Sequence, residues 1–376
     1  MNAHGANDLR QLQSMPLDYK IMMTKERIRV WYESWTQFVI EDLDTGEIRC
    51  ETIDTRDYMA EPKLKESEWI KSAYPGQVYV SFSGGKDSTV LKHIVDSMYD
   101  DVPALFVNTG LEYPEIQRFA MAQKNVVTVR PEMRFDEVLK KFGYPVISKR
   151  VAGYVYSAKR DPNCMRAKWI RGDEWTKFVT GGKYTYLIDS PFGVSARCCD
   201  VMKKHPAHKF QKETGRKPMT GVMACESLNR ENQWIKNGCN GFELAVPISN
   251  PMAFWTEQDV LHYIKIYDVP YCSVYGDIVA DTNPEFEGQL NMIDYLGDYE
   301  AGDKLKTTGC DRTGCIFCMF GCHLEKEPNR FQRLKQTHPR QYDYCINGGE
   351  MVDGKWQPSK EGLGLWKVLD YIGVKY

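Results

Sequence analysis

The sequence predicts an α/β fold with a doubly wound, mostly parallel sheet, an N-terminal helix-and-hairpin addition and a C-terminal lobe that carries cysteines. Three observations predict it. Short apolar runs alternate with amphipathic stretches between residues 77 and 267. The composition, with 42% hydrophobic and 27% charged residues, is typical of a globular protein. A cysteine cluster begins at Cys310. We place the domains at residues 1–70, 71–275 and 276–376.

The first domain is expected to add a helix and a hairpin to the core. Apolar residues recur at helical spacing from Tyr19 to Trp35. The β-prone runs Phe38–Ile40 and Ile48–Ile53 flank the turn residues Asp44–Gly46, which predicts a hairpin. The charged stretch Asp57–Trp69 is expected to end in a helix that leads into the core.

The second domain alternates strands and helices, the pattern of a parallel sheet covered on both faces. Strands are expected at residues 77–82, 104–107, 126–129, 184–188 and 218–223, and helices at 88–99, 115–123, 135–142, 203–213 and 256–267. In the third domain, residues 277–306 are acidic and irregular, residues 325–337 predict a charged helix, and residues 363–376 predict a short terminal helix.

Charge and segment composition exclude several classes of protein. Lys plus Arg is 49 and Asp plus Glu is 51, so no global basic field exists, although a local basic patch stays open. Residues 1–13 lack the apolar core of a signal peptide, and no stretch approaches the ~20 apolar residues that cross a bilayer. We expect a cytoplasmic protein without a membrane partner, in which reduced cysteines that cluster indicate metal or redox chemistry.

A phosphate-binding loop is predicted at Ser83–Ser88, between the first core strand and its helix. The two glycines permit positive φ and let backbone N–H groups converge on an anion, and the helix N-terminus adds its dipole. Lys86 can neutralise phosphate, and Asp87 can hold Mg²⁺ or fix the loop. The motif is neither a Walker loop nor a dinucleotide fingerprint, and a plain turn capped at Ser88 is the alternative.

Further polar residues are expected near this loop. Asn108, Thr109 and Gly110 follow the neighbouring strand at its carboxyl end, where open α/β sheets bind ligands. Arg230 and the pair Lys149-Arg150 are candidate clamps for phosphate or sulfate, because a guanidinium matches oxyanion geometry. For Lys149 and Arg150, an ordinary role as surface cations agrees equally well with the sequence.

The cysteines form two groups. Cys198-Cys199 is a vicinal pair, which cannot easily form a strain-free disulfide. The second group follows the spacing Cys-x4-Cys-x2-Cys-x3-Cys, with members Cys310, Cys315, Cys318 and Cys322. Cys-x-x-Cys places two thiolates on one turn, where they can grip a metal ion or a cluster. Some metal site is therefore expected.

These motifs resemble the PP-loop ATP pyrophosphatases and, more specifically, the phosphoadenosine phosphosulfate (PAPS) reductase family. The similar segments are Ser83–Ser88, Asn108–Glu115, Thr220–Arg230 and Pro247–Val260, within a resemblance that spans residues 78–318. The resemblance implies an adenine nucleotide alpha hydrolase-like fold and a bound adenine nucleotide, either ATP or a sulfonucleotide (PAPS or APS). Implied catalytic residues are Lys86, Asp87 and Arg230. Implied nucleotide-binding residues are Ser81, Ser83, Gly84, Gly85, Lys86, Asp87, Ser88, Asn108, Thr109, Gly110 and Gly221.

The resemblance also implies a cofactor. Iron–sulfur-dependent sulfonucleotide reductases carry a Cys-Cys pair followed by Lys or Arg, and a later Gly-Cys-x-x-Cys. The matching residues imply a 4Fe–4S cluster on Cys198, Cys199, Cys315 and Cys318. The alternative is a local site on Cys310, Cys315, Cys318 and Cys322 that holds zinc or a cluster.

One family motif is missing. The reductases use a cysteine in a C-terminal Glu-Cys-Gly-Leu-His segment, which residues 365–376 lack, and Met223 stands where the family often has Arg. The late cysteine outside the cluster, Cys345, has different surroundings.

Three functions are therefore open. The first is reduction of a sulfonucleotide to sulfite with a thioredoxin-like reductant. The second is an ATP-dependent adenylating sulfurtransferase that thiolates tRNA or DNA and takes sulfur from a donor, with the sulfur held on cluster iron or a cysteine such as Cys322. The third is a non-catalytic nucleotide-sensing protein with a partner, against which the intact Ser83 and Asp87 argue. A homo-oligomer is compatible with each.

Overall fold

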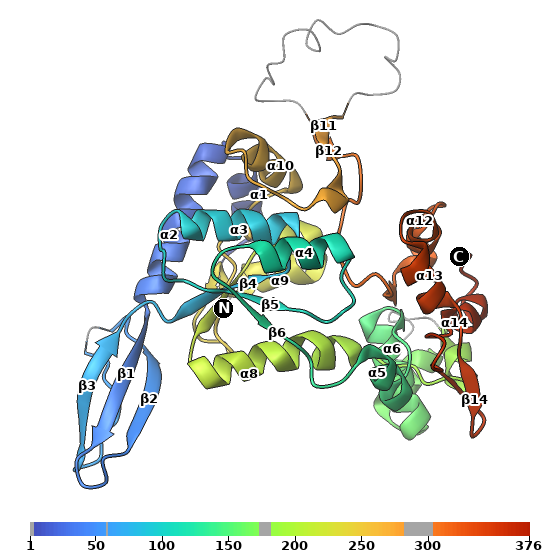
Figure 1. Cartoon of the computed structure of the whole chain (residues 1–376), viewed down its shortest axis with the longest axis horizontal. Helices are drawn as coiled ribbons and strands as arrows, with labels where there is room; N and C mark the ends of the chain where they lie inside the picture. The colour runs from blue at the N-terminus through green and yellow to red at the C-terminus, as the bar shows by residue number, and fades with distance from the viewer. Residues whose placement is uncertain (1–3, 58, 173–181, 282–303) are drawn as a thin grey trace, which may run out of the picture. The chain divides into compact units, whose positions relative to one another are not determined.

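The computed structural model describes residues 4–57, 59–172, 182–281 and 304–376 (Figure 1). The chain divides into two compact units. The first comprises residues 1–107, 113–129 and 208–313, and the second comprises residues 108–112, 130–207 and 314–376. Each unit is thus assembled from segments far apart in the sequence. The domain boundaries near residues 70 and 275 stay a prediction.

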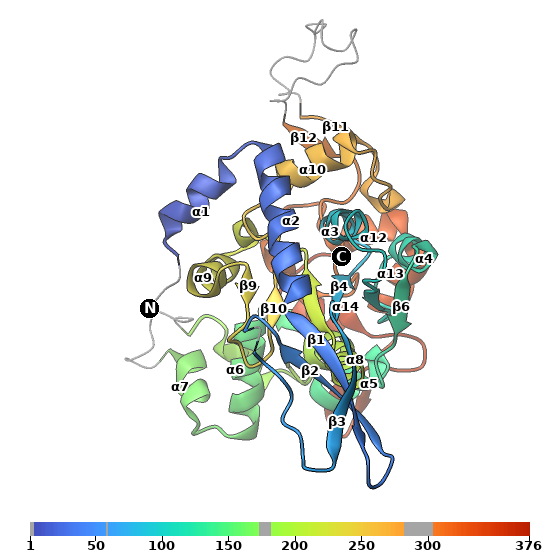
Figure 2. The same ribbon diagram turned by 90° about the vertical axis from the view of Figure 1, so that its left-hand side faces the viewer.

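The first unit begins with two helices and a three-stranded antiparallel sheet of order β2-β1-β3 (Figure 2). The elements are α1 Ala6–Gln13, α2 Leu17–Glu33, β1 Trp35–Asp42, β2 Ile48–Asp54 and β3 Glu68–Tyr74. The pairing of β1 with β2 confirms the predicted hairpin. The prediction of a helix that ends near Trp69 is wrong, because this segment extends to pair with β1, a partner that its charge pattern does not reveal.

A mostly parallel sheet of order β6-β5-β4-β8-β10-β9 forms the centre of the first unit. Its strands are β4 Val78–Phe82, β5 Ala104–Val107, β6 Val126–Val129, β8 Lys217–Thr220, β9 Asn240–Gly241 and β10 Ile248–Ser249. β9 pairs antiparallel with β10, and the other pairs are parallel. The mixed α/β architecture with a mostly parallel sheet is therefore confirmed.

Helices cover both faces of β4 (Figure 1). Val78, Val80 and Phe82 belong to the core that also contains the apolar side of α3, Lys86–Asp96. Tyr79 points to the opposite face, where its ring lies 5.1 Å from that of Phe210 on α8. Successive strand residues alternate between faces, so β4 is buried on both, which explains its continuous apolar run. The other elements of this unit are α4 Pro114–Ala122, α8 His205–Thr214, α9 Leu228–Asn237, α10 Glu257–Ile266, β11 Ile278–Ala280 and β12 Leu305–Thr307.

The second unit is mainly helical. Its helices are α5 Phe135–Phe142, α6 Lys149–Arg160, α7 Met165–Arg171, α12 Arg330–Thr337, α13 Pro339–Ile346 and α14 Leu365–Tyr371. Its strands are β7 Val146–Ile147, β13 Met319–Phe320, β14 Glu350–Val352 and β15 Lys355–Gln357. β13 pairs in parallel with β7, so the segment that follows Cys318 is tied to residues 146–147.

Other sequence-based expectations hold in part. Residues 184–188, expected as a strand, form a 3₁₀ helix over Thr185–Asp189, because local bonds such as Leu187 N–H to the Tyr184 carbonyl (3.2 Å) satisfy the backbone. β11 and β12 lie at the ends of the acidic segment 277–306, of which residues 282–303 lie outside the described residues. Within the described ranges, no helix has both the length and the apolar character needed to cross a bilayer.

Candidate functional site

The loop between β4 and α3 has the backbone that the Gly-Gly pair predicts. Gly84 has φ of 72°, a left-handed conformation that glycine adopts without strain. The Ser83 and Ser88 hydroxyls lie 3.0 Å apart, and the Ser88 hydroxyl also accepts the Ser83 N–H and donates to the Gly85 carbonyl. Ser81 lies inside β4, paired with Leu105 and Thr220. The side chains of the motif thus hold the loop in shape.

Lys86 begins α3 and is buried, with residues from distant segments around it. Its Nζ donates to the Asp311 carbonyl at 3.0 Å and lies 3.0 Å from Glu257 Oε1. Its backbone N–H donates to the Tyr275 hydroxyl at 3.1 Å, and this hydroxyl lies 2.6 Å from Thr313 Oγ1. Burial alone would lower the pKa of Lys86, but the carboxylates of Asp87 and Glu257 raise it above its ordinary value. Lys86 is therefore a permanent cation at the loop.

Asp87 has an unusual environment for a carboxylate. Its Oδ1 atom is buried and accepts no hydrogen bond from the described residues, and Lys86 Nζ lies 3.7 Å away. Burial raises the pKa of Asp87, while Lys86 opposes the rise. A buried acceptor without a donor is rare in folded proteins and calls for an explanation such as a catalytic or ion-binding role. The side chain therefore fits the predicted Mg²⁺ or substrate contact.

Gly221 and Arg230 lie close to the loop in the first unit. A Cβ at Gly221 would meet the carbonyl oxygen of Asp87 at 2.9 Å, so the strand end after β8 packs directly on the loop backbone. Arg230 forms an ion pair with Glu226, which also lies 3.7 Å from Arg312. The structure thus places the guanidiniums of Arg230 and Arg312 and the carboxylate of Glu226 near the position that is predicted to bind phosphate or sulfate.

The motif after β5 belongs to the second unit and forms a tight turn. Thr109 Oγ1 donates to Glu112 at 2.7 Å, and the Gly110 N–H donates to Asn108 Oδ1 at 3.2 Å. Gly110 has φ of 72°. These bonds are internal to the turn, so they give it a defined shape, while any contact with nucleotide stays a prediction.

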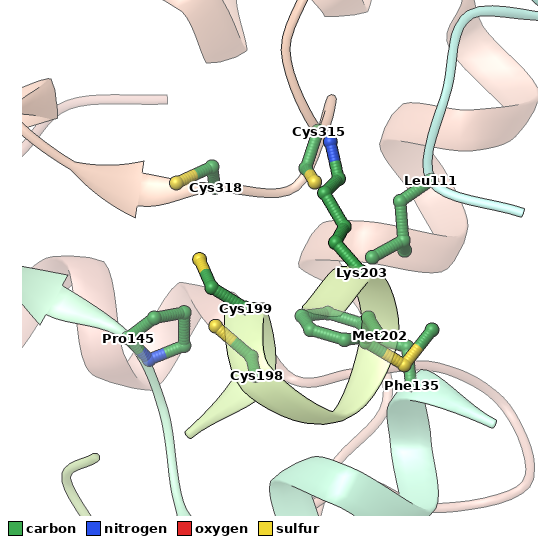
Figure 3. A pocket seen from close by; sticks show the side chains of 9 residues that line it. All are labelled: Leu111, Phe135, Pro145, Cys198, Cys199, Met202, Lys203, Cys315 and Cys318. Carbon is green, nitrogen blue, oxygen red and sulfur yellow. The ribbon is translucent and has the colours of Figure 1, made fainter. Parts of the chain in front are cut away.

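Four cysteines line one cavity in the second unit. Cys198 and Cys199 line one side of it, and Cys315 and Cys318 line the other (Figure 3). The space among these side chains measures about 340 Å³ when the open solvent at its mouth is included. Its lining residues are Leu111, Phe135, Pro145, Cys198, Cys199, Met202, Lys203, Cys315 and Cys318. The structure therefore brings together the four residues that the resemblance implies.

Local structure explains how each pair is held. Cys198-Cys199 precedes a π-helical turn over Asp200–Lys204, which presents both thiols on one side. Cys315 and Cys318 share a turn, in which the Cys318 N–H donates to the Cys315 carbonyl at 3.0 Å. The next residues form β13, and Arg330 donates to the Cys318 carbonyl at 2.8 Å. Both pairs therefore lie on anchored backbone.

Charge in the cavity favours thiolates at some positions. A hydrogen bond between the vicinal thiols lowers the pKa of Cys199 to about 6 and raises that of Cys198, and Lys149 and Lys203 also favour the Cys199 thiolate. Burial raises the pKa of Cys315 to about 11, and Lys203 opposes this. Burial would lower the pKa of Lys203, but Cys315 and other negative groups raise it. Lys203 is thus a cation placed to offset thiolate charge.

The other late cysteines have different surroundings. Cys322 is 1% exposed and its thiol donates to the Met319 carbonyl at 3.0 Å, and burial raises its pKa to about 12. Cys310 belongs to the first unit and Cys345 is completely buried. Over the described ranges, no three His, Cys, Asp or Glu side chains are arranged to hold a single metal ion.

Sequence reasoning did not find several residues at the loop. Glu257 lies in the first turn of α10, Tyr275 precedes the second cysteine group, and Asp311, Arg312 and Thr313 lie inside that group, between Cys310 and Cys315. No local motif marks them, because their role depends on contacts across more than 150 residues of sequence, such as the 225 between Lys86 and Asp311.

A family model described as the phosphoadenosine phosphosulfate reductase domain matches residues 77–152 and 172–319. The uncharacterized protein MJ0973 of Methanocaldococcus jannaschii is 35% identical over 296 residues, which is 78% of this chain and 52% of that protein. The chain thus spans about half the length of that relative.

Relatives with a named activity are more distant. The phosphoadenosine 5'-phosphosulfate reductase of Xylella fastidiosa is 22% identical over 234 residues, covering 62% of this chain and 78% of that protein. The protein of the same name from Cronobacter sakazakii is 22% identical over 231 residues, covering 60% and 78%. The matched region includes the loop and the four cysteines of the cavity but ends before Cys322.

Proposed function

We propose that this chain, which belongs to the phosphoadenosine phosphosulfate reductase family, is an enzyme of sulfur metabolism that acts on a sulfonucleotide. The observation that carries the proposal is the cavity where Cys198-Cys199 faces Cys315 and Cys318 beside Lys203. The PP-loop shape of Ser83–Ser88 supports adenine-nucleotide binding in the same chain. The finer fold assignment, a doubly wound sheet of the adenine nucleotide alpha hydrolase type, is part of this proposal.

The cavity fits an iron–sulfur cluster. Four cysteines are the usual ligand set of a 4Fe–4S cluster, and a nearby lysine offsets part of the thiolate charge. We assign the ligands to Cys198, Cys199, Cys315 and Cys318, and the alternative is zinc or a cluster on the local set Cys310, Cys315, Cys318 and Cys322. When bound, such a cluster supplies an electropositive centre that polarises an oxyanion.

The nucleotide-binding residues of this proposal have distinct roles. Lys86 Nζ contacts the Glu257 carboxylate and the Asp311 carbonyl. Both are polar oxygen acceptors, so phosphate oxygens would replace them as partners of Lys86 when a nucleotide binds. Asp87 would hold Mg²⁺ through Oδ1, which accepts no hydrogen bond from the described residues. Arg230 would bind the anionic group, since its side chain is 37% exposed although paired with Glu226.

The reductase reaction also needs electrons. Release of sulfite breaks the bond between sulfur and the bridging phosphate oxygen and takes up two electrons, for which a thioredoxin-like dithiol is the reductant class. Cys345 does not suit a nucleophilic role, because it is 0% exposed and burial raises its pKa well above the ordinary value. A cysteine that attacks the sulfonucleotide must lie elsewhere.

This burial favours the second candidate function, an ATP-dependent sulfurtransferase. In that reaction the bond between the α- and β-phosphates of ATP breaks, pyrophosphate leaves, and AMP activates an oxygen of tRNA or DNA. Sulfur from a donor then displaces AMP. Lys86 and Asp87 would neutralise the phosphates and hold Mg²⁺ in either reaction, so the loop alone does not separate them.

The test is turnover by anaerobically purified protein. PAPS, APS and ATP are supplied separately, and sulfite and pyrophosphate are measured, the ATP arm with and without tRNA or DNA. Sulfite supports the reductase, whereas pyrophosphate from ATP supports the sulfurtransferase. Asp87→Asn should lower the active turnover on the order of 100-fold. Asp96→Asn on the same helix is the matched control. Neither product from any substrate would contradict both reactions.

A further inference from the structure

Positive charge is concentrated in one part of the chain. Residues 149–204 contain twelve Lys and Arg but five Asp and Glu, although the whole chain has a net charge of −2. Within this segment, α6 and α7 with their connecting loop carry most of the cations: Lys149, Arg150, Lys159, Arg160, Arg166, Lys168 and Arg171. A local basic surface on an otherwise acidic protein indicates a polyanionic partner.

An open groove lies on this basic part of the second unit. It contains about 1080 Å³ of space, including space open to solvent. Its polar lining includes Arg160, Arg166, Arg197, Tyr156, Ser157 and Ser195. The groove is therefore much larger than one phosphate or sulfate ion, and it suits an extended anion.

The three arginines of the groove have no acidic partner within the described residues. Arg166 donates to the Ser157 hydroxyl at 3.2 Å, and the Arg160 guanidinium lies 5.6 Å from the Tyr156 ring centroid. Arg197 lies 5.7 Å from a phenylalanine ring centroid. Three guanidiniums on one groove repel one another, so an anion bound among them is favoured.

The carboxylates at the same groove neutralise only part of this charge. Asp200 pairs with Lys204 at 2.8 Å. Asp161 Oδ1 accepts the Asn163 N–H at 2.9 Å, a bond that leaves its negative charge in place. Within the described part of the chain, three arginines thus share the groove with one carboxylate that has no cationic partner, and the groove keeps a net positive charge.

We propose that this groove binds the phosphodiester backbone of a nucleic acid. Arginine pairs with phosphate through two parallel hydrogen bonds, serine hydroxyls commonly donate to the backbone, and a tyrosine can stack on a base. Arg197 directly precedes Cys198, so a bound strand would lie next to the turn that carries the vicinal cysteines. The inference does not depend on which reaction the enzyme performs.

The test is fluorescence anisotropy with labelled 20-nucleotide RNA and DNA, each single-stranded and as a duplex. The variant Arg160→Ala/Arg166→Ala/Arg197→Ala is compared with the wild-type chain. Each phosphate contact on a single strand contributes about 0.7 to the slope of log K against log salt. Loss of three contacts should reduce the slope by about 2. Affinity falls as salt rises from 50 to 200 mM. The factor by which it falls should therefore be about 20 times smaller for the variant than for the wild type.

A second triple variant controls for charge. Arg10→Ala, Arg118→Ala and Arg340→Ala remove the same number of charges from exposed positions outside the groove, and should leave the slope unchanged. Circular dichroism checks that both variants fold. The proposal is overturned if the wild-type chain binds none of the four nucleic acids, if the groove variant keeps the wild-type slope, or if the control variant loses as much. Binding of inorganic pyrophosphate alone would likewise overturn it in favour of a small-anion site.

Discussion

Replacement of Gly221 by alanine tests how the sheet supports the nucleotide loop. A Cβ at this position would lie 2.9 Å from the Asp87 carbonyl oxygen, 3.0 Å from its carbon and 3.2 Å from the Ser88 nitrogen. All three contacts are with backbone, which cannot turn away as a flexible side chain can. The loop between Ser83 and Ser88 must therefore move by several tenths of an ångström, an overpacking effect that costs about 1–3 kcal/mol.

The displacement should affect both stability and binding. The loop hydroxyls and N–H groups are set by short bonds such as Ser83 to Ser88, so a shift of Asp87 misaligns the anion site. We expect Gly221→Ala to lower nucleotide affinity about tenfold, which corresponds to about 1.4 kcal/mol. Urea unfolding followed by tryptophan fluorescence measures the stability, and calorimetric titration with ATP or PAPS measures the affinity.

Gly153→Ala is the matched control. Gly153 lies inside α6, and a Cβ there meets no atom within 4 Å. Alanine should stabilise this helix by about 0.5–1 kcal/mol, because glycine is the poorer helix former. The same chemical change thus has opposite expected signs at the two positions. The reasoning is refuted if Gly221→Ala unfolds at the wild-type urea concentration and binds nucleotide with unchanged affinity.

Three further predictions concern other parts of the chain. Cys318→Ser should remove the iron and the visible absorption of anaerobically purified protein, whereas Cys322→Ser should keep both; loss of the iron from both variants would favour the local ligand set. Lys20 and Asp259 form an ion pair at 2.7 Å, and both side chains are largely buried. Lys20→Met breaks this pair and should lower the free energy of unfolding, measured in urea, by about 3 kcal/mol. A loss below about 1 kcal/mol would contradict this prediction. Arg49 holds the pKa of Glu68 at about 2, below its ordinary 4.5, so the folded state favours the charged form. The difference in free energy of unfolding between wild type and Glu68→Gln should be complete above about pH 5 and should disappear as the pH falls toward 2. If this difference stays constant over that pH range, the reasoning is refuted.

Much of the nucleotide loop could be predicted from the sequence. The apolar run Val78–Phe82, the Gly-Gly pair and the following amphipathic helix each depend on local spacing, and the structure has β4, a left-handed Gly84 and α3 at these places. The same holds for the hairpin around Asp44–Gly46, whose turn residues act over a few positions. Local propensity was sufficient here because neighbouring residues supply the decisive interactions.

Tertiary structure decided the features that depend on distant partners. β3 is a strand because it pairs with β1, although its charged sequence predicted a helix nearby. The buried partners of Lys86 come from α10 and from Asp311, and no local pattern marks either. The arginine groove needs Arg197 beside α6 and α7, which periodicity does not encode.

The cysteine cavity combines both contributions. The sequence by itself determined which residues carry the chemistry, namely a vicinal pair and a Cys-x-x-Cys turn, because their spacing is local. Only the folded chain decided that the two pairs line one cavity with Lys203, while Cys322 turns to a backbone carbonyl and Cys345 is buried. The physical reason is that β13 pairs with β7 and anchors the Cys318 segment, and such pairing depends on backbone hydrogen bonds between segments about 170 residues apart.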